Sequence, residues 1–172
     1  MLPTRFALVV ALALTPALAT TTGCGRPAYP ASMQHHLLNQ PLPDVHARET
    51  LNAGALDPSS LAGNVVVVKF FAEYCAPCKE TLPAAERVHK SHGDVVFIGV
   101  SLDENRAAAG RIVQAYNLSF PVVYDAARVY QGKFRVSEMP RTFVADRQGI
   151  VRWVGGEGQS EDDLVRAVEA AL

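Results

Sequence analysis

The stretch VVVVKFFAEYCAPCKETLP, from Val65 to Pro83, predicts a buried strand, a Cys-x-x-Cys pair and the start of a helix. Valine and phenylalanine without polar alternation are typical of a strand covered on both faces, as in a parallel sheet between helices. Cys75 follows this strand where the helix begins, and unpaired backbone N–H groups and the helix dipole favour an anion there. We therefore expect the pKa of Cys75 to lie below that of a free thiol. Cys78 comes three residues later and can close a reversible disulfide with Cys75.

A zinc site or a purely structural disulfide is the alternative interpretation of these two cysteines. Zinc needs two further ligands, usually a second Cys-x-x-Cys pair or a pair of histidines. The only other cysteine, Cys24, lies near the N-terminus of the sequence. His89 and His92 follow the pair by roughly two to three helical turns, too far for an easy shared site. The pattern therefore favours redox use of the pair, and we expect no metal here.

The segment KFFAEYCAPCK resembles the active-site segment of the thioredoxin superfamily. The segments QPLPDV, VVFIGVSLDE and EMPRTFVADRQGIV are similar to the extracytoplasmic TlpA/ResA-like thiol–disulfide oxidoreductases of that superfamily. This resemblance covers the chain from about Pro41 to Leu172. It implies that Pro140 is a cis proline facing the disulfide, and that Pro140 and Met139 shape the groove that receives a partner's cysteine segment.

The order of the remaining segments predicts an α/β, thioredoxin-like fold in which a central mixed sheet is flanked by helices. Apolar runs predict strands over residues 65–71, 95–101, 120–124, 142–145 and 150–154. Helical periodicity predicts helices after Cys75, from Asp103-Glu104 and after Ser160. Asp146-Arg147-Gln148-Gly149 is typical of a hairpin turn. We also expect an N-terminal β-hairpin extension, in which Val45–Thr50 pairs with Ala55–Leu56.

The N-terminal region predicts a targeting segment followed by a tether. Residues 1–23 combine a basic residue with a short apolar run, which is typical of a signal peptide. Residues 24–40 predict an irregular spacer, and residues 41–172 the domain. Thr21-Thr22-Gly23-Cys24 resembles a bacterial lipobox, so we expect a lipoprotein with a lipid on Cys24. Cleavage after Ala19 is the alternative and would give a soluble periplasmic or secreted protein.

Lys69 interrupts the apolar strand before the cysteines. In the thioredoxin superfamily this place belongs to a buried acid that assists proton transfer at the second cysteine. A cation near the thiols would favour a thiolate, but a buried, unpaired ammonium is costly. We therefore expect the lysine stem to reach solvent at the sheet edge, and replacement of Lys69 to leave the titration of Cys75 nearly unchanged.

Four other residues near the pair could tune its chemistry or bind substrate. Tyr74 stands where the resembling family usually has tryptophan, and Ala76 and Pro77 separate the cysteines. Thr81 stands where that branch commonly has glutamate, so Glu80, one position earlier, is the remaining candidate for proton handling.

The resemblance implies an exported, membrane-tethered thiol–disulfide oxidoreductase in which Cys75 attacks and Cys78 resolves. It implies action as a reductase on exported protein thiols and disulfides, at the periplasmic face of a bacterial membrane. A membrane thiol reductant would supply the electrons, with cytochrome c maturation as one setting. The chemistry needs no cofactor beyond the disulfide. A formal charge of −1 over 172 residues gives no sign of nucleic-acid binding.

Two other function classes share this fold. Copper-binding metallochaperones space their cysteines one residue wider and add a distant histidine, whereas this chain has no histidine after His92. Thiol peroxidases usually place a lone cysteine after a Thr-x-x pattern, whereas Ala72-Glu73-Tyr74 precedes Cys75. Both remain alternatives to the oxidoreductase.

Overall fold

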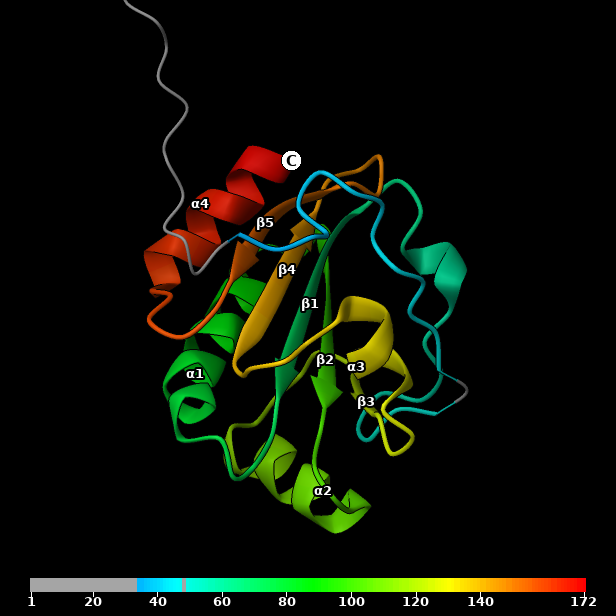
Figure 1. The fold of residues 1–172 in the computed structure, drawn as a ribbon, viewed down its shortest axis with the longest axis vertical. Helices are drawn as coiled ribbons and strands as arrows, with labels where there is room; N and C mark the ends of the chain where they lie inside the picture. The colour runs from blue at the N-terminus through cyan, green and yellow to red at the C-terminus, as the bar shows by residue number, and fades with distance from the viewer. Residues whose placement is uncertain (1–33, 48) are drawn as a thin grey trace, which may run out of the picture.

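A five-stranded mixed sheet forms the centre of the protein (Figure 1). The computed structural model describes residues 34–47 and 49–172. The predicted signal peptide, Cys24 and most of the predicted tether therefore lie outside the described residues. Within the described residues, no helix is both long and apolar enough to cross a bilayer.

The strands occur in the order β3-β2-β1-β4-β5 across the sheet. Their bounds are β1 (Val65–Phe71), β2 (Val95–Ser101), β3 (Val122–Tyr124), β4 (Arg141–Ala145) and β5 (Val151–Gly155). The helices are the 3-10 turn η2 (Pro58–Ser60), α1 (Ala76–Ser91), α2 (Arg106–Ala115), α3 (Val129–Phe134) and α4 (Glu161–Ala171). Strand β1 pairs in parallel with β2 and antiparallel with β4. The predicted mixed sheet and its position between helices are confirmed.

Strand β1 lies in the middle of the sheet, and all seven of its residues are buried. Alternate side chains of the strand enter two separate cores. Val65, Val67 and Phe71 pack on one face with apolar residues of α1 and α4. Val66, Val68 and Phe70 pack on the other face with α3 and the N-terminal segment. Figure 1 shows α1 and α4 together on one side of the sheet and α3 on the other. Burial on both faces explains why the strand is apolar along its whole length.

Two local signals near the C-terminus form the structures that they predict. Strands β4 and β5 pair antiparallel, and Gly149 in the connecting turn has φ +74°, which a glycine adopts without steric cost. The α4 helix begins with a capping box, in which Ser160 and Asp163 exchange side-chain-to-backbone hydrogen bonds.

The N-terminal segment differs from its prediction. The chain does reverse direction, but the described residues between 45 and 56 form one isolated antiparallel bridge, Ala47 to Leu56, and no strands. The two segments of the expected β-hairpin extension therefore pair, but among the described residues only through this single bridge. Val45 and Leu56 are buried in the core on the α3 side of the sheet, so burial of apolar side chains holds this segment together with the backbone hydrogen bonds between Ala47 and Leu56. Leu37 is buried there too, so the folded part of the chain begins before Pro41.

Candidate functional site

Cys75 and Cys78 form a disulfide at the N-terminus of α1, with an S–S distance of 2.04 Å. Cys75 is the N-cap of this helix, and its Sγ accepts a hydrogen bond of 3.2 Å from the backbone N–H of Cys78. Pro77 lies in the first turn, where its missing N–H leaves no helical bond unmade. After reduction, a thiolate on Cys75 would face the free N–H groups and the positive end of the helix dipole. The disulfide and its position at a strand–helix junction match the sequence prediction.

The two sulfurs differ in access to solvent. Cys75 retains 7% of its surface exposed, whereas Cys78 has none. Cys75, which also lines a groove, is therefore the more accessible cysteine of the pair. This difference agrees with the sequence prediction that Cys75 attacks and Cys78 resolves, which stays a prediction.

A groove of about 400 Å³ runs beside Cys75. Its lining residues come from the loop before α1, the start of α1, the residue after β2, helix α3 and the segment that follows α3; they are Tyr74, Cys75, Ala76, Pro77, Leu102, Gln131, Val136, Ser137, Glu138 and Met139. The Met139–Pro140 peptide bond is cis, as the resemblance implies. Met139 lines the groove, whereas Pro140 is buried and does not. Tyr74 is 64% exposed, so its ring is free to pack against a bound segment.

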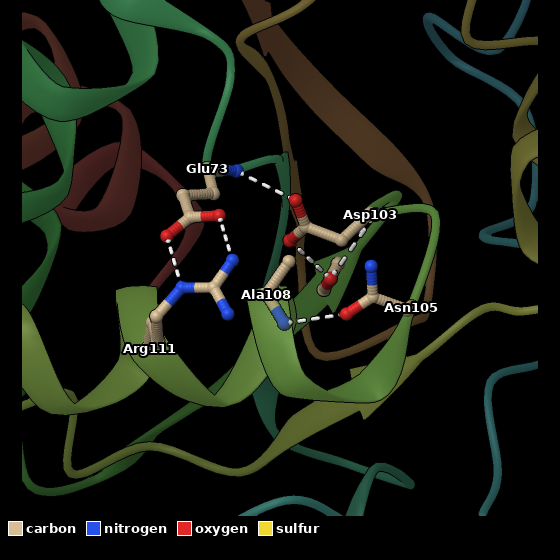
Figure 2. A network of polar contacts seen from close by, with 6 residues as sticks. Glu73, Asp103, Asn105, Ala108 and Arg111 are labelled. Atoms are coloured by element: carbon tan, nitrogen blue, oxygen red, sulfur yellow. Dashed lines mark hydrogen bonds and ion pairs between the residues drawn. The ribbon is translucent and has the colours of Figure 1, made fainter.

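A polar network fixes the residue two positions before Cys75 (Figure 2). The backbone N–H of Glu73 donates to Asp103 Oδ1 at 2.8 Å, and the hydroxyl of Ser101 donates to Asp103 Oδ2 at 2.8 Å. Arg111 of α2 donates two hydrogen bonds to the Glu73 carboxylate, at 2.7 and 2.6 Å. These bonds from Arg111 lower the pKa of Glu73, so the carboxylate stays ionised. The network attaches the loop that carries Cys75 to the end of β2 and to α2.

Lys69 lies inside the protein, and the expectation that its stem reaches solvent is wrong. The residue is only 1% exposed. Its Nζ donates to Thr81 Oγ1 at 3.0 Å and to Thr142 Oγ1 at 3.3 Å. Burial lowers the pKa of Lys69 to about 7, because the charged form loses its hydration. This burial is tolerable for two reasons. Two neutral hydroxyls accept hydrogen bonds from the amine, and the lowered pKa lets the amine lose its proton and become uncharged.

Glu80, the candidate that the sequence analysis names for proton handling, does not point into the buried region beside the cysteines. Its side chain is exposed on α1, whereas Thr81, the next residue, is buried. The resemblance had placed a glutamate at the position of Thr81, and the structure places there the hydroxyl that accepts from Lys69.

Comparison with known proteins identifies the family. The model of the AhpC/TSA family matches residues 38–154. This chain belongs to the AhpC/TSA family. It is 31% identical over 111 residues to the thiol-disulfide oxidoreductase ResA of Bacillus subtilis, covering 63% of this chain and 62% of ResA. It is 26% identical over 117 residues to the thioredoxin-like protein YneN of the same organism, covering 66% of this chain and 68% of YneN. The chain thus spans less than two thirds of the length of ResA.

Solved structures confirm the thioredoxin-like fold of this AhpC/TSA family member. DsbF of Mycobacterium tuberculosis superposes with a TM-score of 0.68 at 30% identity, covering 74% of this chain and 95% of DsbF. A secreted disulfide oxidoreductase of M. tuberculosis that is homologous to Escherichia coli DsbE gives a TM-score of 0.67 at 26% identity, covering 73% of this chain and 95% of that chain. A thioredoxin family protein of Chlorobium tepidum gives 0.67 at 25% identity, covering 76% and 94%.

Sequence reasoning missed three polar residues that shape this site. Asp103 was expected to start the second helix, but Asn105 caps it, and Asp103 is buried beneath the loop before the cysteines. Arg111 carries no local signal, because its partner Glu73 is 38 residues away in sequence. Arg141 follows the cis proline, is buried, and pairs with Glu138 at the groove. Only the polar Arg141 at the start of an apolar strand could have been noticed in the sequence.

The described residues contain no group of three or more His, Cys, Asp or Glu side chains able to hold a metal ion. The ring of His89 packs against Phe97 and Phe120, and burial lowers the pKa of His89. His89 is therefore a core residue on the far part of α1.

Proposed function

We propose that this AhpC/TSA family member is a thiol–disulfide oxidoreductase that uses the Cys75–Cys78 pair. The observation that carries the proposal is the disulfide at the N-terminus of α1, with one sulfur accessible beside a groove and the other buried. The similarity to ResA and to DsbE-like and DsbF structures supports it.

In the proposed reaction, the thiolate of reduced Cys75 attacks a disulfide of a substrate protein. The substrate's S–S bond breaks, one substrate sulfur leaves as a thiolate, and the other stays in a mixed disulfide with Cys75. Cys78 then attacks the Cys75 sulfur, closes the internal disulfide and releases the second substrate thiolate. Two electrons pass from the cysteine pair to the substrate. The groove beside Cys75, with Tyr74 and Met139 in its walls, holds the substrate segment.

We further propose that the protein works as a reductase on exported proteins. A membrane dithiol protein would regenerate the reduced pair, so no organic cofactor takes part. The lipobox-like Thr21–Cys24 segment supports attachment through a lipid on Cys24, at the periplasmic face of a bacterial membrane. Cleavage after Ala19 is the alternative and would leave a soluble exported protein. One similar structure is that of a secreted oxidoreductase.

Trapping of the mixed disulfide tests the proposal. Replacement of Cys78 removes the resolving thiol, so the full chain carrying Cys78→Ser should accumulate covalent complexes through Cys75 when expressed in a bacterium with an envelope. Non-reducing electrophoresis and mass spectrometry identify these complexes. Cys75→Ser is the matched control, because it leaves only the buried thiol of the pair. If Cys78→Ser traps no exported protein and the reduced wild type does not reduce insulin disulfides, the proposed function is wrong.

The same preparation distinguishes the two alternative functions. Copper(I) titration of the reduced protein would reveal a metallochaperone through tight binding at one ion per chain. Stopped-flow oxidation by peroxide would reveal a peroxidase through a rate far above that of an ordinary thiol. For the proposed oxidoreductase we expect neither result.

A further inference from the structure

Lys69 is a buried amine next to the redox pair. Its side chain lies on the face of β1 that packs beneath α1, the same face to which Cys78 belongs. Lys69 and Cys78 are 1% and 0% exposed. Among the described residues, no carboxylate forms a salt bridge with Lys69, and its two hydrogen-bond partners are the hydroxyls of Thr81 and Thr142. The amine therefore lies in a buried region in which the part of the chain that the structure describes supplies no counter-ion.

Thr81 connects the amine to the turn of helix that carries Cys78. The Thr81 hydroxyl accepts from Lys69 Nζ at 3.0 Å and donates to the backbone carbonyl of Cys78 at 3.2 Å. Residues three apart on a helix have Cβ atoms about 5–6 Å apart, so Thr81 and Cys78 are neighbours on the same helical face. Thr81 thus links Lys69 to Cys78 inside the protein, where all three side chains are buried away from water. Electrostatic interaction is much stronger in such surroundings than at the surface.

The other charged groups near this region have partners or face solvent. On α1, Lys79 and Glu80 are exposed and Glu86 bonds Ser119. At the end of β2, Asp103 bonds Ser101 and the backbone of Glu73, and on β4, Arg141 pairs with Glu138. The side chains that α4 buries against the sheet are uncharged; they are Leu164, Ala167, Val168 and Ala171. Strand β2 places Gly99 opposite Lys69, and His89 packs between aromatic rings on a later turn of α1.

We propose that Lys69 is a redox-linked proton site, whose amine takes up a proton when the Cys75–Cys78 disulfide is reduced and releases it when the disulfide forms again. The cause is mutual stabilisation: a thiolate produced by reduction favours the ammonium, and the ammonium favours the thiolate. Burial has already brought the pKa of Lys69 to about 7 in the disulfide form, so a nearby negative charge changes its protonation in the neutral range. Lys69 acts on the Cys75–Cys78 pair through the charge of its amine, so it is a positioning residue for the two cysteines.

This inference rests on the proposed redox cycle, and its proton and electron balance is complete. A partner dithiol gives two electrons and two protons and becomes a disulfide. The Cys75–Cys78 bond breaks. One proton goes to the sulfur of Cys78 and the other to the nitrogen of Lys69, and Cys75 remains a thiolate. When Cys75 later attacks a substrate disulfide and Cys78 closes the ring, both protons leave with the reduced substrate or to solvent.

NMR titration of the lysine side chains tests the inference directly. The chain contains only four lysines, so selective ¹³C labelling of their Cε atoms gives few signals, and Lys69→Met assigns the one of interest. In the full-length oxidised protein we expect Lys69 to titrate near neutral pH. In the protein reduced with dithiothreitol, we expect its midpoint to rise by ~1 unit or more, because an opposite charge at short range has that effect. The Cys75→Ser/Cys78→Ser variant is the matched control and should titrate like the oxidised form under both conditions. Equal midpoints in oxidised and reduced wild type would overturn the inference.

The reciprocal effect on Cys75 gives a second measurement. Lys69→Met and Lys69→Gln, each combined with Cys78→Ala, should slow alkylation of Cys75 near neutral pH about threefold or more, because the thiolate loses its cation. Lys79→Met removes an exposed lysine that is closer to the pair in sequence, and water screens its charge. An equal effect of Lys79→Met and both Lys69 variants would overturn the inference. Chemical reduction and alkylation need no partner protein, so these results are independent of whether substrate trapping succeeds.

Discussion

Replacement of Lys69 by methionine should change the pH dependence of stability in a direction fixed by its burial. The pKa of this lysine falls from its ordinary 10.5 to about 7 in the folded protein. The unfolded chain therefore binds a proton between these two pH values that the folded chain does not. The free energy of unfolding contributed by Lys69 must then rise as pH increases through this window and fall as pH decreases toward 7. Methionine has a similar length and no proton, so Lys69→Met removes this dependence.

The size of the effect follows from the same values. Each pKa unit corresponds to about 1.4 kcal/mol, so the free-energy difference between variant and wild type should change by ~3 kcal/mol between pH 7 and pH 10. Lys69→Met should be the more stable protein at pH 7, where wild type loses most from the buried amine, and this advantage should shrink toward pH 10. The residue is almost fully buried, so solvent screening does not reduce the estimate much.

Urea unfolding of the oxidised proteins at several pH values measures this difference. A Cys24→Ser background removes the remaining thiol, so the disulfide cannot exchange at alkaline pH. Lys79→Met is the control, since it removes an exposed lysine of the neighbouring helix α1, and its effect on stability should not change with pH. Subtraction of the wild-type curve cancels every other titrating group. Parallel curves for wild type and Lys69→Met would refute the assignment of a neutral amine in this core.

Two further substitutions test how the site is held. Asp103→Ala should lower the free energy of unfolding by about 1–3 kcal/mol, because it leaves the N–H of Glu73 and the hydroxyl of Ser101 without their acceptor. Urea unfolding measures this loss. A slower reduction of insulin would show that the loop before Cys75 has moved. Ser160→Ala should lower the stability by about 1 kcal/mol through loss of the α4 capping box while insulin reduction stays unchanged, and a large loss of activity would contradict a purely local role.

The parts of the structure that the sequence predicted correctly are those specified by neighbouring residues. The apolar run of β1, the helix that begins after Cys75 and the capped α4 depend on residues within one or two turns of each other. The hairpin between β4 and β5 is of the same kind, since Gly149 alone supplies the positive φ that its turn needs. Local signals also suggested the N-terminal hairpin, where the described residues form a single antiparallel bridge and no strands. Val45 and Leu56 bury their side chains singly against the sheet, which apolar spacing does not distinguish from a paired strand.

The contacts that complete the site join segments that are remote in sequence. Asp103 accepts a hydrogen bond from Glu73, which is 30 residues away in sequence, and Thr142 accepts one from Lys69, which is 73 residues away. No pattern within one segment specifies such a pair. The resemblance to a known family indicated the Cys75–Cys78 disulfide and the cis bond before Pro140, because those residues match the family motif. It gave no information on Arg111, which belongs to no quoted motif, or on the hydrogen bond between Lys69 and Thr142.

Lys69 and Thr81 show how two departures from a family pattern can form one arrangement. Taken singly, Lys69 in a buried strand would place a costly unpaired ammonium in the core, and Thr81 only marks a position where the family commonly has glutamate. The structure joins them by a hydrogen bond of 3.0 Å on the face of the sheet beneath α1. On a central strand with neighbours on both sides, the lysine stem has no short route to an edge. A glutamate at position 81 would pair with the amine and hold it charged in both redox states, since an opposite charge favours the ammonium. A threonine accepts one hydrogen bond and adds no charge, so the amine can change its protonation as the neighbouring sulfurs change theirs.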